Sequence, residues 1–181
     1  MGPLVKPLWK RPDVWIPTVC ALFLILWITT QGQPRALSQP LEEAAAVTAT
    51  AMLQAVGAPS QLEGTRITTG RTYNDVTSEC SGLEIMLAMA LLTFTIGRLF
   101  GVAMRPTITA AVLMVGLAFV MNSLRIASIS FVAWQSGVEV AWGTWHDASA
   151  YIAFGVTYAV MFLTLLKLRV KGPPQSPRFT S

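Results

Sequence analysis

Four long apolar blocks constrain the fold of this chain more than any other feature of its sequence. A helix that crosses a bilayer needs roughly 20 predominantly apolar residues, because unpaired backbone N–H and C=O groups are too costly in lipid. Blocks of about this length lie at Val14 to Thr30, Ser81 to Phe100, Thr107 to Arg125 and Asp147 to Lys167. They predict an all-α polytopic membrane protein with about four transmembrane helices.

The composition agrees with this class, and two of the blocks leave an alternative open. Hydrophobic residues make up 53% of the chain and charged residues 12%, about half the charged fraction of a soluble domain.

The third block continues through "IASISFVAW", so one tilted helix and a span followed by an interfacial helix both fit. The first block fits an uncleaved anchor or a signal peptide. We favour the anchor, because "TTQGQPRALS" has no good small-x-small cleavage site.

The charged residues orient these blocks in the membrane. Most of the basic residues lie before the first block, between the second and third, or after the fourth: Lys6, Lys10, Arg11, Arg98, Arg105, Lys167, Arg169, Lys171 and Arg178. All the acidic residues except Asp13 fall on the opposite side. By the positive-inside rule, both termini are predicted to be cytoplasmic. The net charge of +4 is explained by this topology and by the attraction of basic residues to the anionic inner leaflet. It is therefore no sign of a nucleic-acid partner.

The segment between the first two blocks is polar enough to lie in water. "QPLEEAAAVTATAMLQAVGAP" predicts a helix that begins at Pro40 with its paired glutamates and ends near Gly57. "LEGTRITTGRTYNDVTSEC" predicts a small β-hairpin, because Gly64 and Gly70 delimit stretches rich in Thr, Ile, Val and Tyr. We therefore divide the chain into a cytoplasmic N-terminus and anchor (1–30), an extracytoplasmic helix and hairpin (31–80), a transmembrane core of three helices (81–170) and a disordered cytoplasmic tail (171–181).

Cys80 lies directly before the second block and is the first candidate functional residue. Ser81 and Glu84 have the spacing of a capping box, which predicts a helix that begins at Ser81. The positive end of that helix would favour the thiolate form of Cys80. The alternative is a small buried hydrophobe without a chemical role. A disulfide to Cys20 is not expected, because the two thiols should lie on the order of 20 Å apart in a bilayer.

Arg125 and His146 are the other two candidates. Arg125 lies at the predicted outer end of the third block, where it either has a function or reaches the headgroups as a snorkelling side chain. Asn122, three residues earlier on the same helical face, is a supporting residue. His146, the single histidine, opens the fourth block beside Asp147, which we expect to be the helix N-cap. The alternative for His146 is a place in an aromatic belt with its neighbouring tryptophans.

The predicted depth of these residues favours a catalytic interpretation. Cys80, Arg125 and His146 map to one membrane interface on three separate helices. A cysteine hydrolase or transpeptidase needs a thiolate nucleophile and an imidazole that moves its proton. A guanidinium can stabilise the tetrahedral oxyanion or hold a substrate carbonyl or carboxylate. One histidine and one cysteine at this face give little support to a metal site, and no cofactor is expected.

Three short motifs resemble the exosortase/archaeosortase family of polytopic membrane cysteine transpeptidases. They are "ECSG" leading into a span, "NSLRI" at the end of the next, and "WHDASAYIAFG" opening the last, and the resemblance covers about residues 45 to 165. It implies that Cys80 is the nucleophile, Arg125 its electrostatic partner and His146 the general acid/base, with Asn122 in support. Members commonly carry more spans ahead of the cysteine. This chain has one predicted span before its cysteine. It is then either a compact member of the family, or it needs a second copy or a partner membrane protein to complete its helical bundle.

The resemblance also implies substrates and a location. Family substrates are exported proteins that end in a short signature such as Pro-Glu-Pro, a membrane helix and a basic tail, often in species that make exopolysaccharide. The enzyme would cleave near the signature at the outer face of the plasma (inner) membrane and transfer the protein to an acceptor or to water. The alternative function is a non-catalytic integral subunit of a protein-export or exopolysaccharide assembly system. A thiol redox protein and an intramembrane serine protease are disfavoured, because the chain lacks C-x-x-C and G-x-S-G.

Overall fold

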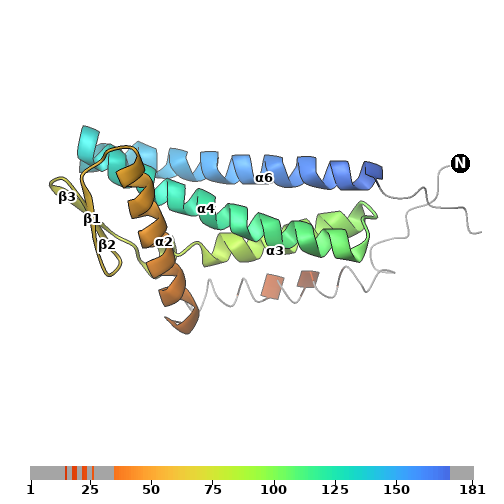
Figure 1. Cartoon of the computed structure of the whole chain (residues 1–181). Coiled ribbons are helices and arrows are strands. Elements are labelled where there is room, and N and C mark those ends of the chain that lie inside the picture. Colours follow the sequence, from red (N-terminus) through yellow and green to blue (C-terminus); the bar gives the residue numbers. More distant parts are fainter. Residues whose placement is uncertain (1–14, 16–17, 20–21, 24–25, 27–34, 172–181) are drawn as a thin grey trace, which may run out of the picture.

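The computed structural model describes residues 35–171 and six residues before them: Trp15, Thr18, Val19, Leu22, Phe23 and Leu26. Within this part, three helical segments are long and apolar enough to cross a membrane: Ser78–Leu99, Met104–Ser136 and Val138–Arg169. Figure 1 shows them running side by side as α3, α4 and α6, with a helix and a small sheet at one end. The predicted class, a mostly helical polytopic membrane protein, is confirmed.

The first predicted span, Val14 to Thr30, lies largely outside the described residues. The six residues of this span that the structure describes are all helical. One of them, Thr18, contacts α3 through a hydrogen bond between its Oγ1 and Oγ1 of Thr95, at 2.9 Å. Cys20 and residues 172–181 of the predicted tail also lie outside the described part of the chain.

Helices α3 (Leu83–Leu99) and α4 (Met104–Ser136) form an antiparallel pair with α6 (His146–Lys171) packed alongside. Gly97 lets α3 and α4 approach closely, because a Cβ there would lie 2.8 Å from Cγ2 of Thr107. The shared core is made of side chains from all three helices: Met89, Ala110, Met114, Ala118, Met161 and Leu165. The pair α3 and α4 confirms two of the predicted spans.

Helix α4 is longer than the predicted third span. It is one continuous helix to Ser136, so the first of the two interpretations, a single long helix, is the one observed. The prediction that Arg125 ends this helix is wrong, because the apolar and small residues after it keep the helix packed. Eleven residues follow Arg125 in α4, a length of about 16 Å at 1.5 Å per residue.

Helix α2 (Arg35–Ala55) crosses the end of the bundle (Figure 1). It begins five residues before the predicted start at Pro40, which instead lies inside the helix. Because proline has no backbone N–H, Pro40 cannot donate to the carbonyl four residues earlier. Near the start of a helix, this is the only intrahelical hydrogen bond that the proline removes. The middle of α2 packs on α4 through fully buried small residues, Ala45, Ala46 and Ala49, which meet Ile126 and Ala127. The close approach of the two helices follows from these alanines.

The sheet has three antiparallel strands in the order β1 (Ser60–Glu63), β2 (Arg66–Thr69) and β3 (Thr72–Asp75). The predicted hairpin is the pair β2 and β3, and β1 adds a third strand. Both connections are two-residue turns that begin with glycine at positive φ, Gly64 at 62° and Gly70 at 61°. This is the pattern of the type II′ turn, whose twist matches that of the strands.

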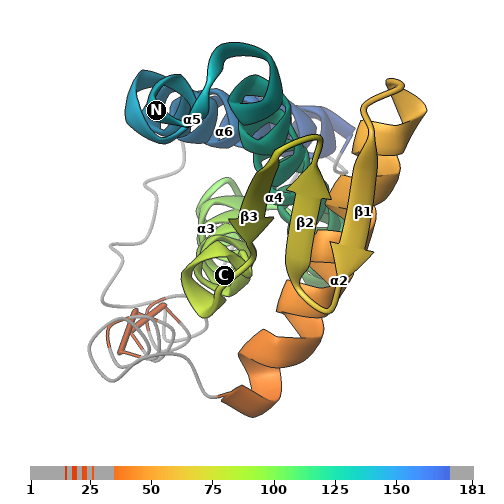
Figure 2. The ribbon, with the colours of Figure 1, turned by 90° about the vertical axis from the view of Figure 1, so that its left-hand side faces the viewer.

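We call residues 35–80, which comprise α2, the sheet and the turn after it, the cap. The cap is held on the part of α4 that follows Arg125. Asn74 of β3 donates from Nδ2 to Oγ of Ser130 at 3.2 Å, and a Cβ on Gly70 would lie 2.6 Å from Cδ1 of Trp134. Figure 2, which looks at this end, shows the sheet beside α2 with α4 behind them. The long α4 therefore positions the cap over the bundle.

Candidate active site

Cys80 ends a short 3₁₀ turn, Ser78–Cys80, that leads from the cap into α3. Its amide donates to the carbonyl of Thr77 at 2.8 Å. Its side chain is half-buried against the apolar cluster between α2 and α4. Cys80 is a free cysteine, as predicted.

The predicted capping box of Ser81 and Glu84 is wrong. Helix α3 begins at Leu83 and its N-cap is Gly82, whose φ of 78° separates the 3₁₀ turn from the helix. Ser81 is buried, and its Oγ accepts a hydrogen bond from the amide of Leu83 at 3.3 Å, whereas Glu84 is exposed. Cys80 thus lies three residues before the helix. The predicted activation of its thiol by the helix dipole is weakened, since that effect falls off within the first turn.

Asn122 of α4 fixes the turn that carries Cys80. The buried Asn122 side chain donates from Nδ2 to the carbonyl oxygen of Cys80 at 2.8 Å. The same amide packs against Gly82, where a Cβ would lie 2.8 Å from Nδ2. Because Asn122 precedes Arg125 by one helical turn, this contact ties the backbone of Cys80 to the face of α4 next to the arginine.

Arg125 and His146 are in direct contact. Nη2 of Arg125 lies 2.7 Å from Nε2 of His146, and Nδ1 of His146 lies 3.1 Å from Oδ1 of Asp147. A guanidinium only donates hydrogen bonds, so Nε2 must accept, and the imidazole proton lies on Nδ1 and is donated to Asp147. The ring of Trp142 stacks on the imidazole at 5.6 Å with an interplanar angle of 23°. Asp147 and Trp142 together set the tautomer and the orientation of the ring.

The helix that carries His146, α6, follows a kink in the chain. Two short segments precede α6, namely α5 (Val138–Val140), whose N-cap is Gly137, and η3 (Ala141–Trp145). Within η3 the backbone of Gly143 is not helical, with φ of −89° and ψ of −115°, so the chain is kinked there before α6 begins. Asp147 lies in the first turn of α6, but the prediction that it is the N-cap is wrong, because His146 before it already has helical φ and ψ of −53° and −49°. Its carboxylate instead accepts from the imidazole. The kinked segment immediately precedes His146 and carries both Trp142 and Trp145.

The structure brings the candidates together in two groups. Arg125, His146 and Asp147 form one hydrogen-bonded chain, and Asn122 holds the backbone of Cys80 beside it. Among the described residues, Sγ of Cys80 makes no hydrogen bond, so the thiol and the imidazole are not joined directly. The catalytic roles of these residues stay predictions.

Arg125 has few partners for a charged side chain. Its Nε is buried and has no hydrogen-bond partner in the described part of the chain, and no carboxylate there pairs with its guanidinium. Arg66 in the cap is the contrast: it forms two hydrogen bonds to Asp75, at 2.6 and 3.0 Å. This bond lowers the pKa of Asp75 and raises that of Arg66.

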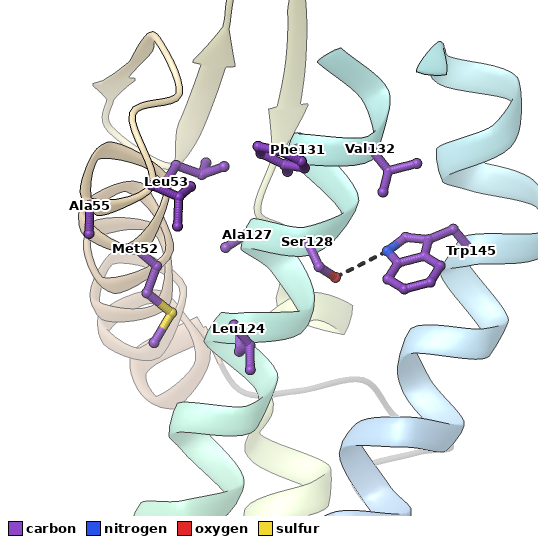
Figure 3. A pocket seen from close by; sticks show the side chains of 10 residues that line it. Met52, Leu53, Ala55, Leu124, Ala127, Ser128, Phe131, Val132 and Trp145 are labelled. Carbon is purple, nitrogen blue, oxygen red and sulfur yellow. Dashed lines mark hydrogen bonds between the residues drawn. The ribbon is translucent and has the colours of Figure 1, made fainter. Parts of the chain in front are cut away.

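An apolar pocket of about 520 Å³ lies between α2, α4 and Trp145 (Figure 3). Its polar side chains satisfy each other, since Nε1 of Trp145 donates to Oγ of Ser128 at 3.2 Å. Ser128 Oγ in turn donates to the carbonyl oxygen of Arg125 at 2.8 Å, which links the pocket wall to the arginine. The sequence prediction missed this pocket. Its signal was the helical spacing of Leu124, Ser128 and Phe131 together with a tryptophan whose N–H needs a partner.

The fold and the site define a polytopic membrane protein with a free thiol beside a linked arginine and histidine. The chain belongs to the transmembrane exosortase family, whose family model matches residues 9–163. The resemblance stated from residues 45 to 165 is confirmed, and the match extends it to the first predicted span. The family contains cysteine transpeptidases and processes C-terminal sorting signals of proteins. No curated protein and no solved structure matches the chain.

Proposed function

We propose that this protein is a membrane-embedded cysteine transpeptidase that cleaves the C-terminal sorting signals of exported proteins. The observation that carries the proposal is the hydrogen-bonded chain of Arg125, His146 and Asp147 next to the turn that holds Cys80. A thiol, an imidazole of fixed tautomer and a guanidinium are the groups that acyl transfer through a thioester needs.

The proposed reaction begins with proton transfer from Sγ of Cys80 to Nε2 of His146. The thiolate attacks the carbonyl carbon of the scissile peptide bond, and the guanidinium of Arg125 stabilises the resulting oxyanion. The C–N bond then breaks, and the leaving nitrogen takes the proton from His146. The sorting helix departs as an amine, while the exported protein remains bound to Cys80 as a thioester. An acceptor nucleophile or water passes its proton to His146, attacks the thioester and releases the thiol.

The place of the site in the bundle supports a substrate that is itself anchored in the membrane. The candidate residues lie where α3 meets the cap, so a peptide bond just outside a transmembrane segment would be at the same depth. Basic residues cluster at the opposite end of the described helices, at Arg98, Arg105, Lys167 and Arg169. By the positive-inside rule, the cap and the site are extracytoplasmic, and both termini are cytoplasmic.

The proposal is tested by co-expressing the protein with an exported protein that ends in a sorting signal. Cys80→Ala, Arg125→Ala and His146→Ala are each expected to abolish processing or to slow it at least 100-fold, since removing a general base or an oxyanion donor costs about 10² to 10⁴ in rate. Cys20→Ala, which removes the other cysteine, is the matched control and is expected to process normally. Normal processing by Cys80→Ala would instead favour the alternative function, a non-catalytic integral subunit.

A further inference from the structure

The electrostatic surroundings of Arg125 are incomplete in the described structure. The side chain is half-buried in a helix of membrane-spanning length, where an arginine without an anionic partner is costly. Within the described residues, its single hydrogen bond runs from Nη2 to the imidazole of His146, a neutral acceptor in the assigned tautomer. Nε is buried and unpaired among the described residues. A guanidinium offers five N–H donors in a planar fork, so most of this fork is unused.

The same hydrogen bond blocks His146 as a base. Nε2 accepts from Arg125, and the proton on Nδ1 is donated to Asp147. An imidazole in this state has no free lone pair in its ring plane, so it cannot accept the proton of Cys80. The observed contact is therefore a resting arrangement, which must open before the thiol is activated.

The geometry indicates which partner moves. The imidazole is held by two other contacts, the bond to Asp147 and the stack on Trp142. The backbone of Arg125 is also held, because its carbonyl accepts from Ser128, which is itself bonded to Trp145. Only the guanidinium end of Arg125 lacks a second attachment within the described residues. Opening the contact is thus a rotation of one side chain around a fixed ring.

We propose that a carboxylate of the sorting signal binds the guanidinium of Arg125 and thereby releases Nε2 of His146. A carboxylate can engage the unused fork with two charge-assisted hydrogen bonds, which are stronger than the single bond to a neutral imidazole. Arg125 then couples recognition of an acidic substrate residue to activation of the base. This inference rests on the proposed function, and it makes Arg125 a specificity-determining residue in addition to its role at the oxyanion.

His146 is the only histidine in the chain, so the contact can be observed directly. Full-length Cys80→Ala protein labelled with ¹⁵N-histidine in lipid nanodiscs gives one imidazole by NMR, without turnover. The probes are two acetylated tripeptide amides that differ only in a central glutamate or glutamine. The glutamate peptide is expected to shift the Nε2 resonance and to bind roughly 10- to 100-fold more tightly than the glutamine peptide. Equal responses to both peptides, or no response to either at tens of millimolar, would overturn the proposal.

Variants separate recognition by Arg125 from general folding effects. With Arg125→Gln, the Nε2 resonance should lie at the released position without peptide, and the two peptides should bind alike. Arg125→Lys keeps the charge and should retain part of the discrimination. Arg66→Gln, which removes an exposed arginine of the cap, is the matched control and should leave both the resonance and the discrimination unchanged. Persistent discrimination in Arg125→Gln would refute the coupling.

Failure of the coupling through Arg125 can be told apart from failure of the proposed transpeptidase function. If processing depends on Cys80 but a glutamate-to-glutamine change in the sorting signal leaves its rate unchanged, the transpeptidase assignment stands and the coupling through Arg125 is refuted. If the glutamate peptide shifts Nε2 but Cys80→Ala still processes substrate, the carboxylate site stands and the assignment of Cys80 as nucleophile is refuted.

Discussion

Gly82 is the position at which a single methyl group should disturb the candidate site most selectively. Its φ of 78° lies in the left-handed region, and a Cβ there would come within 2.8 Å of Nδ2 and 3.0 Å of Cγ of Asn122. Gly82→Ala therefore has two effects, backbone strain and displacement of the amide that holds the carbonyl of Cys80. The strain costs about 1–2 kcal/mol, and loss of the hydrogen bond adds about 0.5–1.5 kcal/mol.

Gly57 provides the matched control for this prediction. It has the same φ of 78°, but a Cβ there meets nothing within 4 Å. Gly57→Ala should thus cost the strain alone, about 1–2 kcal/mol. The free energy of unfolding is measured in mixed micelles by denaturant titration, and the labelling rate of Cys80 by a maleimide is measured in a Cys20→Ser background. Only Gly82→Ala should change the labelling rate. Equal destabilisation and equal labelling in the two variants would refute the role assigned to Asn122.

Three further predictions concern residues around the site and in the cap. His146→Ala should slow processing by a factor of about 10² to 10⁴. Asp147→Asn should slow it less than tenfold, because the asparagine oxygen can still accept from Nδ1 of His146 and the side chain is exposed. The processing rates of the two variants check this prediction. Trp145→Phe keeps the apolar wall of the pocket but leaves Ser128 without its donor, and should lower the free energy of unfolding by about 0.5–1.5 kcal/mol. The pKa of Asp75 is lowered by its bond to Arg66, so the pair stabilises the cap fully above the ordinary pKa of an aspartate, and this contribution is lost as the pH falls through the lowered value. Asp75→Asn should remove that part of the acid dependence when the free energy of unfolding is measured by denaturant titration across this pH range, and an unchanged profile would contradict it.

The transmembrane helices could be predicted from the sequence because one strong physical constraint determines them. Backbone groups in lipid must be paired within the helix, so hydropathy alone located α3, α4 and α6. The ends of the helices were harder to predict. Ser81 and Asp147 each have the sequence pattern of an N-cap, but Gly82 takes that place in α3, and His146, just before Asp147, already has helical φ and ψ. Local patterns indicate that a helix begins nearby, but they do not fix the residue at which it begins.

The candidate site was predicted by residue type and depth, but its contacts were not. The sequence indicated Cys80, Arg125 and His146 at one interface, and the structure adds the direct bond between the last two. It also adds the bond from Asn122 to the backbone of Cys80, which depends on how α3 packs against α4. Spacing along a chain does not encode such contacts between helices, because they depend on the rotation and crossing of each pair.

The central claim is that Cys80 forms a covalent intermediate with the exported protein, and its most direct test is isolation of that intermediate. The purified protein is mixed with a membrane-anchored substrate, quenched with acid, digested and examined by mass spectrometry. We expect the peptide that contains Cys80 to carry the new C-terminus of the substrate as a thioester, which hydroxylamine cleaves, and we expect none on Cys20. Cleavage of the substrate without any such adduct, or with full yield in Cys80→Ala, would contradict the claim.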